Sequence, residues 1–223
     1  MKVKTIKTLA AVAVLAGPLA LGALVVFHPG VALGAPRFLT WQGDQSMPDQ
    51  ASFTPDPMHT SVGFEIGHLG LSKVQGRFTK FTGHIVANKA VDGSSVEFTI
   101  QTDSVDTAVP PRDADLRSAN FFDVANYPEM VYKSSSIRKS HGGYVADGTL
   151  TLKGVSKPVA IPFKVFGPIK DFQGKQRIGI LADPITIKRS DFGMAYDLKM
   201  PDGSEGVGDA VTIRLSVEAT QDK

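Results

Sequence analysis

Histidine is the residue type in this sequence best suited to metal binding or acid–base chemistry, because its pKa lies near neutrality. The five histidines are His28, His59, His68, His84 and His141. No two of them have the close spacing of a zinc-binding helix motif. His59, His68 and a distant carboxylate could still form a metal site, but we predict none. For His68 we favour a hydrogen bond to its neighbours, and the alternative is contact with the polar end of a ligand.

Nucleophilic catalysis is not indicated by the sequence. There is no Gly-x-Ser-x-Gly elbow and no nucleophile with a base close to it in the chain. Asp191-Phe192-Gly193 spells the metal-binding triplet of kinases, but the Gly-rich loop and the His-Arg-Asp loop of kinases are missing. Phe192 is better interpreted as an apolar plug, with Gly193 permitting a turn. We therefore predict no catalytic residue and no cofactor.

A charged cluster comprises Arg112, Asp113, Asp115 and Arg117. We expect these residues to form salt bridges around a short helix rather than to act as a catalytic carboxylate pair. The alternative is that Arg112, Arg117 and Arg189 meet an anionic head group, because the guanidinium fork matches phosphate geometry. For each arginine we favour the structural ion pair.

The net charge of +2 depends on the N-terminus, where three lysines are the only charges before Arg37. Without those three, 21 basic residues face 22 acidic ones, a balance of −1. A near-neutral body without a basic patch excludes nucleic acid as an expected partner. The absence of cysteine excludes disulfides, thiol chemistry and a lipid-modified cysteine anchor.

The first 34 residues read as a targeting segment. Residues 1–8 are basic and residues 9–27 are almost wholly apolar, as in a secretory signal. We favour cleavage before Ala35, with an uncleaved membrane anchor as the alternative. Either arrangement places the body outside the cytoplasmic membrane, and we expect a periplasmic protein. Residues 35–52 are polar and irregular, and we interpret them as a spacer before a domain at residues 53–223.

The body alternates short runs of β-branched and aromatic residues with turn signals, which predicts strands. In the first strand, Phe64, Ile66 and His68 share one face. In the second, Phe78 and Phe81 have opposite parity, so we expect a bulge or bend near Thr79-Lys80. A short helix is expected within residues 110–123, between strands three and four. The eight predicted strands are 60–68, 74–87, 95–102, 129–138, 144–153, 159–166, 176–188 (broken near residues 183–184) and 209–219.

Short turns between consecutive strands favour antiparallel pairing, and a sheet of about eight strands tends to close into a barrel. A two-sheet sandwich is the structural alternative. Thirteen phenylalanines against one tryptophan and four tyrosines favour rings without a polar group. Composition leaves open whether these rings fill the centre of the barrel or line a hollow one.

Several motifs, in this order and spacing, resemble the YceI-like polyisoprenoid-binding family over residues 53–219. They include Asp56-Pro57-Met58-His59, His68-Leu69-Gly70, Gly76-Arg77-Phe78, Ser104-Val105-Asp106-Thr107, Phe121-Phe122-Asp123-Val124, Gly148-Thr149-Leu150-Thr151-Leu152-Lys153-Gly154-Val155 and Lys188-Arg189-Ser190-Asp191-Phe192-Gly193-Met194. The resemblance implies an all-β fold, an eight-stranded antiparallel lipocalin-like barrel. It also implies a non-enzymatic carrier or store for a long isoprenoid or quinone-like lipid, often as a homodimer.

On this hypothesis the lipid tail lies along the barrel axis, with His68, Arg112 and Arg117 at the mouth and transient membrane contact during exchange. The expected ligand-binding residues are Phe64, Ile66, His68, Phe78, Phe98, Ile100, Arg112, Arg117, Met130, Tyr132, Leu150 and Phe163. Two alternatives stay open at this point. One is an enzyme that acts on a small lipid-like substrate in the barrel, and the other is an envelope adaptor with a solid core.

Overall fold

The computed structural model describes residues 49–223. The predicted signal or anchor and the predicted spacer up to residue 48 lie outside the described residues. Within the described part, no helix is both long enough and apolar enough to cross a membrane.

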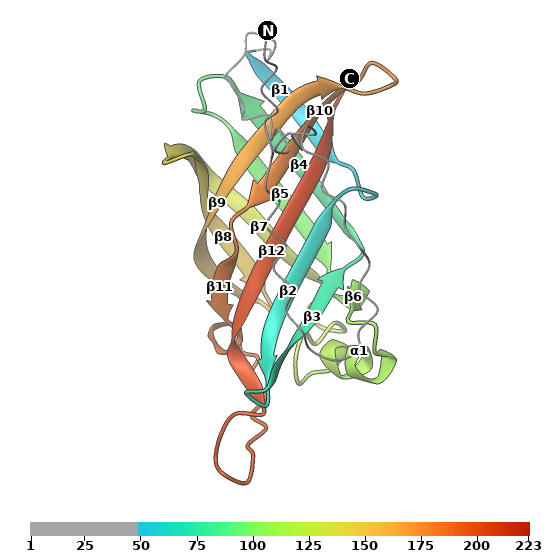
Figure 1. The fold of residues 1–223 in the computed structure, drawn as a ribbon, viewed down its shortest axis with the longest axis vertical. Coiled ribbons are helices and arrows are strands. Elements are labelled where there is room, and N and C mark those ends of the chain that lie inside the picture. The colour runs from blue at the N-terminus through green and yellow to red at the C-terminus, as the bar shows by residue number, and fades with distance from the viewer. Residues whose placement is uncertain (1–48) are drawn as a thin grey trace, which may run out of the picture. The chain divides into compact units, whose positions relative to one another are not determined.

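Twelve strands form one antiparallel sheet that closes on itself (Figure 1). A single α-helix, α1 (Pro110–Arg117), and two 3-10 helices, η1 (Thr102–Ser104) and η2 (Arg189–Phe192), accompany the strands in residues 49–223. The strands are β1 (Gln50–Pro55), β2 (Ser61–His68), β3 (Ser72–Phe78), β4 (Phe81–Asn88), β5 (Ser95–Gln101), β6 (Val105–Asp106), β7 (Glu129–Ser140), β8 (Gly143–Leu152), β9 (Val155–Lys170), β10 (Gln176–Ala182), β11 (Ile185–Lys188) and β12 (Val207–Gln221).

These twelve segments make eight barrel strands, because four of the eight are bent. β1 continues into β2, β3 into β4, β5 into β6, and β10 into β11, each across a short interruption. The barrel closes where β12 pairs with β1 and β2 on one side and with β10 and β11 on the other. Closure leaves few free edges for aggregation, and it confirms the predicted eight-stranded antiparallel barrel.

The bends lie where residue parity requires them. Phe78 and Phe81 both face inward because Thr79 and Lys80 interrupt the strand, as predicted. Ser104 secures this bend: its carbonyl accepts the N–H of Thr79 at 3.1 Å, and its hydroxyl oxygen accepts the N–H of Lys80 at 3.1 Å. The break near residues 183–184 also appears, between β10 and β11.

β1 was not predicted from the sequence, and it begins three residues before residue 53, where we placed the start of the domain. Residues 50–52, which we assigned to the spacer, belong to β1 and pair with β4. In β1, Ala51, Phe53 and Pro55 are buried, and Phe53 has no exposed surface. The prolines around Asp56 and the polar residues between the buried ones obscured this alternation. β1 is therefore part of the barrel wall and not of a tether.

The wall has one stretch without a complete hydrogen-bond ladder. β10 pairs with residues 163–170 of β9, but β11 pairs only with β12 among the described strands. Pro158 and Pro162 occupy the part of β9 next to this stretch. Proline lacks an N–H donor, so it is suited to a strand whose outer side has no partner.

Candidate ligand-binding cavity

A cavity of about 450 Å³ occupies the barrel interior. Its wall consists mostly of aliphatic and aromatic side chains contributed by β2, β3, β4, β5, β7, β8, β9, β10, β11 and β12. Its polar lining residues include Asn88 and Ser94 near the β4–β5 turn, and His68, Arg112 and Arg189 at the end that carries α1 (Figure 1). We call this second end the α1 end, and the other the β9–β10 end. The volume is within the range of roughly 300–1,000 Å³ common for small-molecule sites.

Eleven of the twelve residues expected to bind ligand line this cavity. In the first predicted strand, the side chains that face the cavity are those that the alternation indicated: Phe64, Ile66 and His68. The other eight are Phe78, Phe98, Ile100, Arg112, Met130, Tyr132, Leu150 and Phe163. Their contact with a ligand stays a prediction.

Arg117 is the exception, because it does not line the cavity. Its Nε donates to the carbonyl oxygen of Asp103 at 2.7 Å, and its Nη2 donates to that of Val105 at 2.7 Å. The guanidinium thus fastens α1 to η1 and β6. This geometry gives Arg117 a structural role and provides no support for contact with a head group.

The prediction of salt bridges around α1 is wrong. Arg112 donates from Nε to the hydroxyl of Thr107 at 2.8 Å and from Nη2 to its carbonyl at 3.0 Å. The Thr107 hydroxyl in turn donates to Asp113 at 2.5 Å, and the Thr107 N–H donates to the same carboxylate oxygen at 2.9 Å. Asp113 is buried, so a relay through Thr107 replaces the direct ion pair at the cavity wall.

Arg189 is also not in an ion pair among the described residues. It is only 7% exposed, and its guanidinium donates to the carbonyls of Met194, Gly208 and Val207 at 2.5, 3.0 and 3.2 Å. A charged donor satisfies several backbone acceptors at once, which compensates the desolvation of its charge. Arg189 therefore holds the two ends of the segment 194–208 together at the α1 end.

The Asp191-Phe192-Gly193 triplet has the structural role expected for it. Phe192 is 2% exposed and packs in the core. Gly193 has a φ of 72° and ends η2 in the left-handed region. A residue with a β-carbon would be strained there.

Tyr132 carries the only phenol that the sequence interpretation placed at the lipid. Its hydroxyl lies 2.9 Å from the carbonyl oxygen of Ala146 and 3.2 Å from that of Val159, and donates toward both. Burial, with a smaller contribution from the negative charge of Asp147, raises the pKa of Tyr132 to about 12. The phenol is therefore protonated at neutral pH and bound to backbone, which is unsuited to proton transfer.

Glycines on the inner face of the barrel wall, beneath aromatic rings, explain why so many rings leave space at the centre of the cavity. A β-carbon on Gly76 would lie 2.3 Å from Cζ of Phe64, the residue directly opposite it on β2. A β-carbon on Gly83 would lie 3.1 Å from the ring of Phe98, and one on Gly148 would lie 2.7 Å from the phenol of Tyr132. Each ring therefore lies against a glycine on the neighbouring strand instead of projecting across the lumen. The sequence interpretation missed these glycines, and their signal is an inward-phase glycine opposite or diagonal to an aromatic residue.

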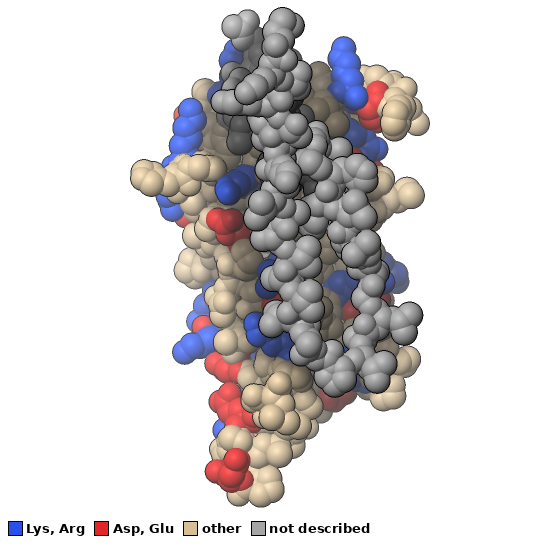
Figure 2. All heavy atoms as spheres, in the orientation of Figure 1, with Lys and Arg blue, Asp and Glu red and all other residues tan. Residues whose placement is uncertain are grey.

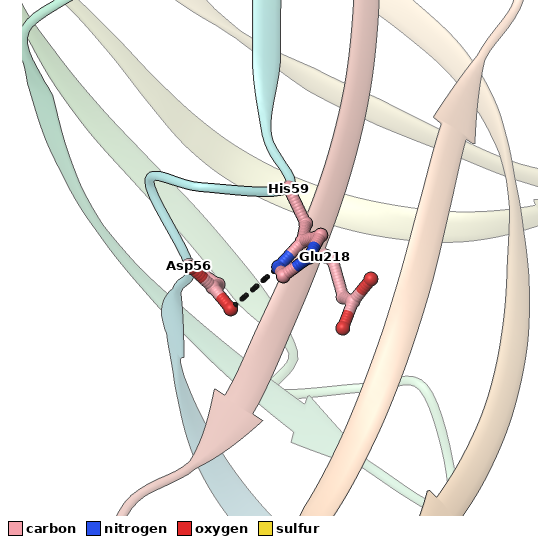
Figure 3. Close-up of side chains that lie close together, drawn as sticks. All are labelled: Asp56, His59 and Glu218. Carbon is pink, nitrogen blue, oxygen red and sulfur yellow. Dashed lines mark hydrogen bonds and ion pairs between the residues drawn. The ribbon is translucent and has the colours of Figure 1, made fainter. Parts of the chain in front are cut away.

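Outside the cavity, Asp56, His59 and Glu218 form a cluster whose ligand atoms could hold a metal ion (Figure 3). Asp56 accepts a hydrogen bond from the His59 ring at 2.9 Å, which with the Met58 N–H lowers the pKa of Asp56 to about 2. Arg177 already binds this cluster: Nη1 contacts Asp56 at 2.9 Å and also contacts Glu218. A guanidinium that neutralises both carboxylates makes this an ion-pair network at the β1–β12 closure rather than a metal site.

The fold and the cavity define the class of this protein: it is a lipocalin-like closed antiparallel β-barrel with an apolar interior cavity. The model of the YceI-like domain matches residues 53–219, and the chain belongs to this family. The family assignment confirms the resemblance carried by the sequence motifs.

Individual relatives agree with this assignment. Protein YceI of Salmonella arizonae is 39% identical over 166 residues, which cover 74% of this chain and 83% of that protein. The crystal structure of a Campylobacter jejuni YceI protein is 31% identical, with a TM-score of 0.60 over 71% of this chain and 91% of that one. A polyisoprenoid binding domain from Saccharophagus degradans shares the fold at 15% identity, with a TM-score of 0.56 over 77% of this chain and 99% of that one.

Proposed function

We propose that this protein binds a long apolar lipid, of polyisoprenoid or isoprenoid-quinone type, inside the barrel. The observation that carries the proposal is the cavity of about 450 Å³, whose wall is mostly aliphatic and aromatic. An apolar wall favours a hydrocarbon ligand over a polar one, since every polar group of a ligand would lose its hydration there. The Saccharophagus degradans domain, which has the same fold, is described as polyisoprenoid binding, and this supports the same ligand class.

The size of the cavity sets the scale of the binding energy. At about 10–15 Å³ for each water-sized group, 450 Å³ offers room for roughly 30–45 of them. A lipid chain with about 20 buried methylene-sized groups would gain on the order of 16 kcal/mol gross, at ~0.8 kcal/mol each. Immobilisation of a flexible chain offsets much of this gain, and the competing environment is a bilayer rather than water. We therefore expect moderate affinity and weak selectivity for chain length.

The proposal is for binding and not for catalysis. Three polar side chains of the cavity wall already have partners: Tyr132 donates to backbone, Arg112 to Thr107, and Arg189 to three carbonyls. His68 also lines the cavity, but its side chain makes no hydrogen bond to another described residue, so the hydrogen bond predicted for it is not found. Among the described residues, no buried side-chain nitrogen or oxygen lacks a hydrogen-bond partner. A reactive centre would need a positioned group with unused capacity, so these contacts favour a carrier or store over an enzyme.

Carriage or storage in the periplasm is part of the proposal. It is supported by the basic start and the apolar run at residues 9–27, which are typical of an export signal. A homodimer stays an expectation from the family resemblance.

The decisive experiment is purification of the protein from its native envelope, followed by organic extraction and identification of the extract by mass spectrometry. We expect an isoprenoid lipid near one molecule per barrel. Delipidated protein should also take up an isoprenoid quinone or an isoprenoid phosphate. If no lipid co-purifies and neither probe is taken up, lipid binding is wrong. Turnover of a lipid-like substrate that is lost on mutation of His68, with lipid still bound, would favour an enzyme.

A further inference from the structure

The turn between β9 and β10 exposes apolar side chains at the tip of a hairpin. Phe172 is fully exposed, and Ile169 at the base of the turn is 55% exposed. Figure 1 shows this hairpin projecting at the end of the barrel opposite α1. A phenylalanine without any packing contributes nothing to the stability of the barrel, and together with Ile169 it gives the tip an apolar surface that another body can cover.

The charges around this tip are cationic. Lys170 and Lys175 flank Phe172, and neither forms an ion pair within residues 49–223. The one carboxylate in the turn, Asp171, accepts Nε of Arg177 at 3.1 Å and the N–H groups of Gln173 and Lys175 at 2.8 and 2.9 Å. Because that negative charge is already paired, the two lysines determine the charge that the tip presents.

The chain segment 189–209, at the α1 end of the barrel, has the opposite character. Residues 189–209 include five acidic side chains against two basic ones. Figure 2 shows acidic groups gathered toward the lower end of the molecule, while at the upper right a basic side chain projects beside an acidic group and uncharged residues. An anionic surface would repel the α1 end and attract the β9–β10 end.

We propose that the β9–β10 hairpin tip, residues 169–175, docks into the surface of an anionic phospholipid bilayer. Phe172 and Ile169 enter the interfacial region, while Lys170 and Lys175 contact the lipid phosphates. Pro168 and Ile178, which adjoin the tip, line the cavity, so docking brings the β9–β10 end of the cavity to the membrane. β1 starts at this same end, and the apolar segment 9–27 precedes it in the sequence (Figure 1).

The test uses the full chain, whose lack of cysteine allows a single label. Gln173→Cys places a polarity-sensitive fluorophore at the tip, and Ser204→Cys places it at the α1 end. Vesicles contain phosphatidylcholine alone or with about one third phosphatidylglycerol. We expect the emission of the tip label to shift to the blue only with anionic vesicles, and the label at residue 204 not to respond. A label at each position separates immersion of the tip from membrane attachment through any other part of the chain.

Variants of the tip-labelled protein measure how much the two lysines and Phe172 each contribute to immersion of the tip. Lys170→Gln with Lys175→Gln should lower the equilibrium constant for tip immersion about 25-fold, at about fivefold for each lysine. Phe172→Ser should lower it about tenfold. Leu71→Ser is the matched control, since Leu71 is 86% exposed in the β2–β3 turn at the α1 end. The proposal is overturned if the tip label does not respond, responds equally to neutral vesicles, or keeps its response in both tip variants.

Discussion

Ala182→Phe is the substitution that most directly tests whether the barrel interior is an open lipid site. Ala182 ends β10 halfway along the wall formed by β10 and β11, and it lines the cavity opposite Phe163. The preceding residue, Leu181, has the opposite parity and is 49% exposed. Leu181→Phe therefore makes a matched control with a new ring on the outside of the same strand.

The expected changes in stability and lipid affinity follow from the six carbon atoms that Ala182→Phe adds. In an open cavity, burial of the new ring gains roughly 2 kcal/mol, and loss of its rotamer freedom costs about 0.5–1 kcal/mol. The lipid-free protein should thus become about 1 kcal/mol more stable. The same ring removes room for about six methylene-sized groups, roughly 5 kcal/mol gross of lipid contact at ~0.8 kcal/mol each. The displaced part of the lipid chain regains mobility, which offsets about half of this lost contact energy. Lipid affinity should therefore fall roughly 100-fold.

The assay combines urea unfolding of lipid-free protein with titration of a fluorescent isoprenoid, monitored also by native mass spectrometry. Opposite signs are expected for Ala182→Phe: a higher free energy of unfolding and weaker lipid binding. A solid core would respond to the extra ring with a loss of about 1–3 kcal/mol, because overpacking strains the neighbours. A destabilised Ala182→Phe protein that still binds lipid normally would refute an open cavity at this position, provided that Leu181→Phe changes neither quantity.

Four further outcomes are expected. Gly76→Ala should push the Phe64 ring into the lumen, since the new β-carbon would meet its Cζ at 2.3 Å, and lipid titration should show weaker binding with little change in stability. Phe53→Ala should lower the free energy of unfolding by about 3–5 kcal/mol in urea, because this side chain is fully buried in β1. Arg117→Ala should cost about 2–3 kcal/mol by leaving two carbonyls unpaired, while lipid bound per folded molecule stays unchanged. Asp56 has a folded pKa of about 2 against its ordinary 3.8, so its contribution is present above pH ~4 and is lost as the pH falls toward 2; acid titration of Asp56→Asn should lack this loss, of about 1 kcal/mol.

The wall of the barrel was predictable because its signals are local. An alternation of apolar and polar residues fixes which side chains face inward, whatever strand lies alongside. The opposite parity of Phe78 and Phe81 even located the bend at Thr79-Lys80. β1 was missed although Ala51 and Phe53 alternate with polar residues, because the run is short and is followed by Pro55 and a second proline two residues on.

The partners of the arginines were not predictable, because they depend on pairings between distant segments. Acidic neighbours in sequence suggested ion pairs for Arg112 and Arg117, yet both donate to groups on the segment that joins β5 to α1. The hollow interior was not predictable for the same reason, because it too depends on how distant segments pair. Only the register of β2 with β3 brings Phe64 over Gly76, and neither residue alone indicates that the ring lies along the wall.

The charges at the α1 end of the cavity bear on which head groups the proposed site would distinguish. Arg112 and Arg189 line this end, and Asp115 lines it beside them, with Asp113 behind Thr107. Two positive and two negative charges balance, and the guanidinium groups already donate to protein acceptors. An anionic head group would therefore find no net positive field here, and its desolvation would be compensated only in part. Discrimination between lipids would then depend on how the chain packs against the apolar wall, so neutral and anionic lipids of equal chain length should bind with similar affinity.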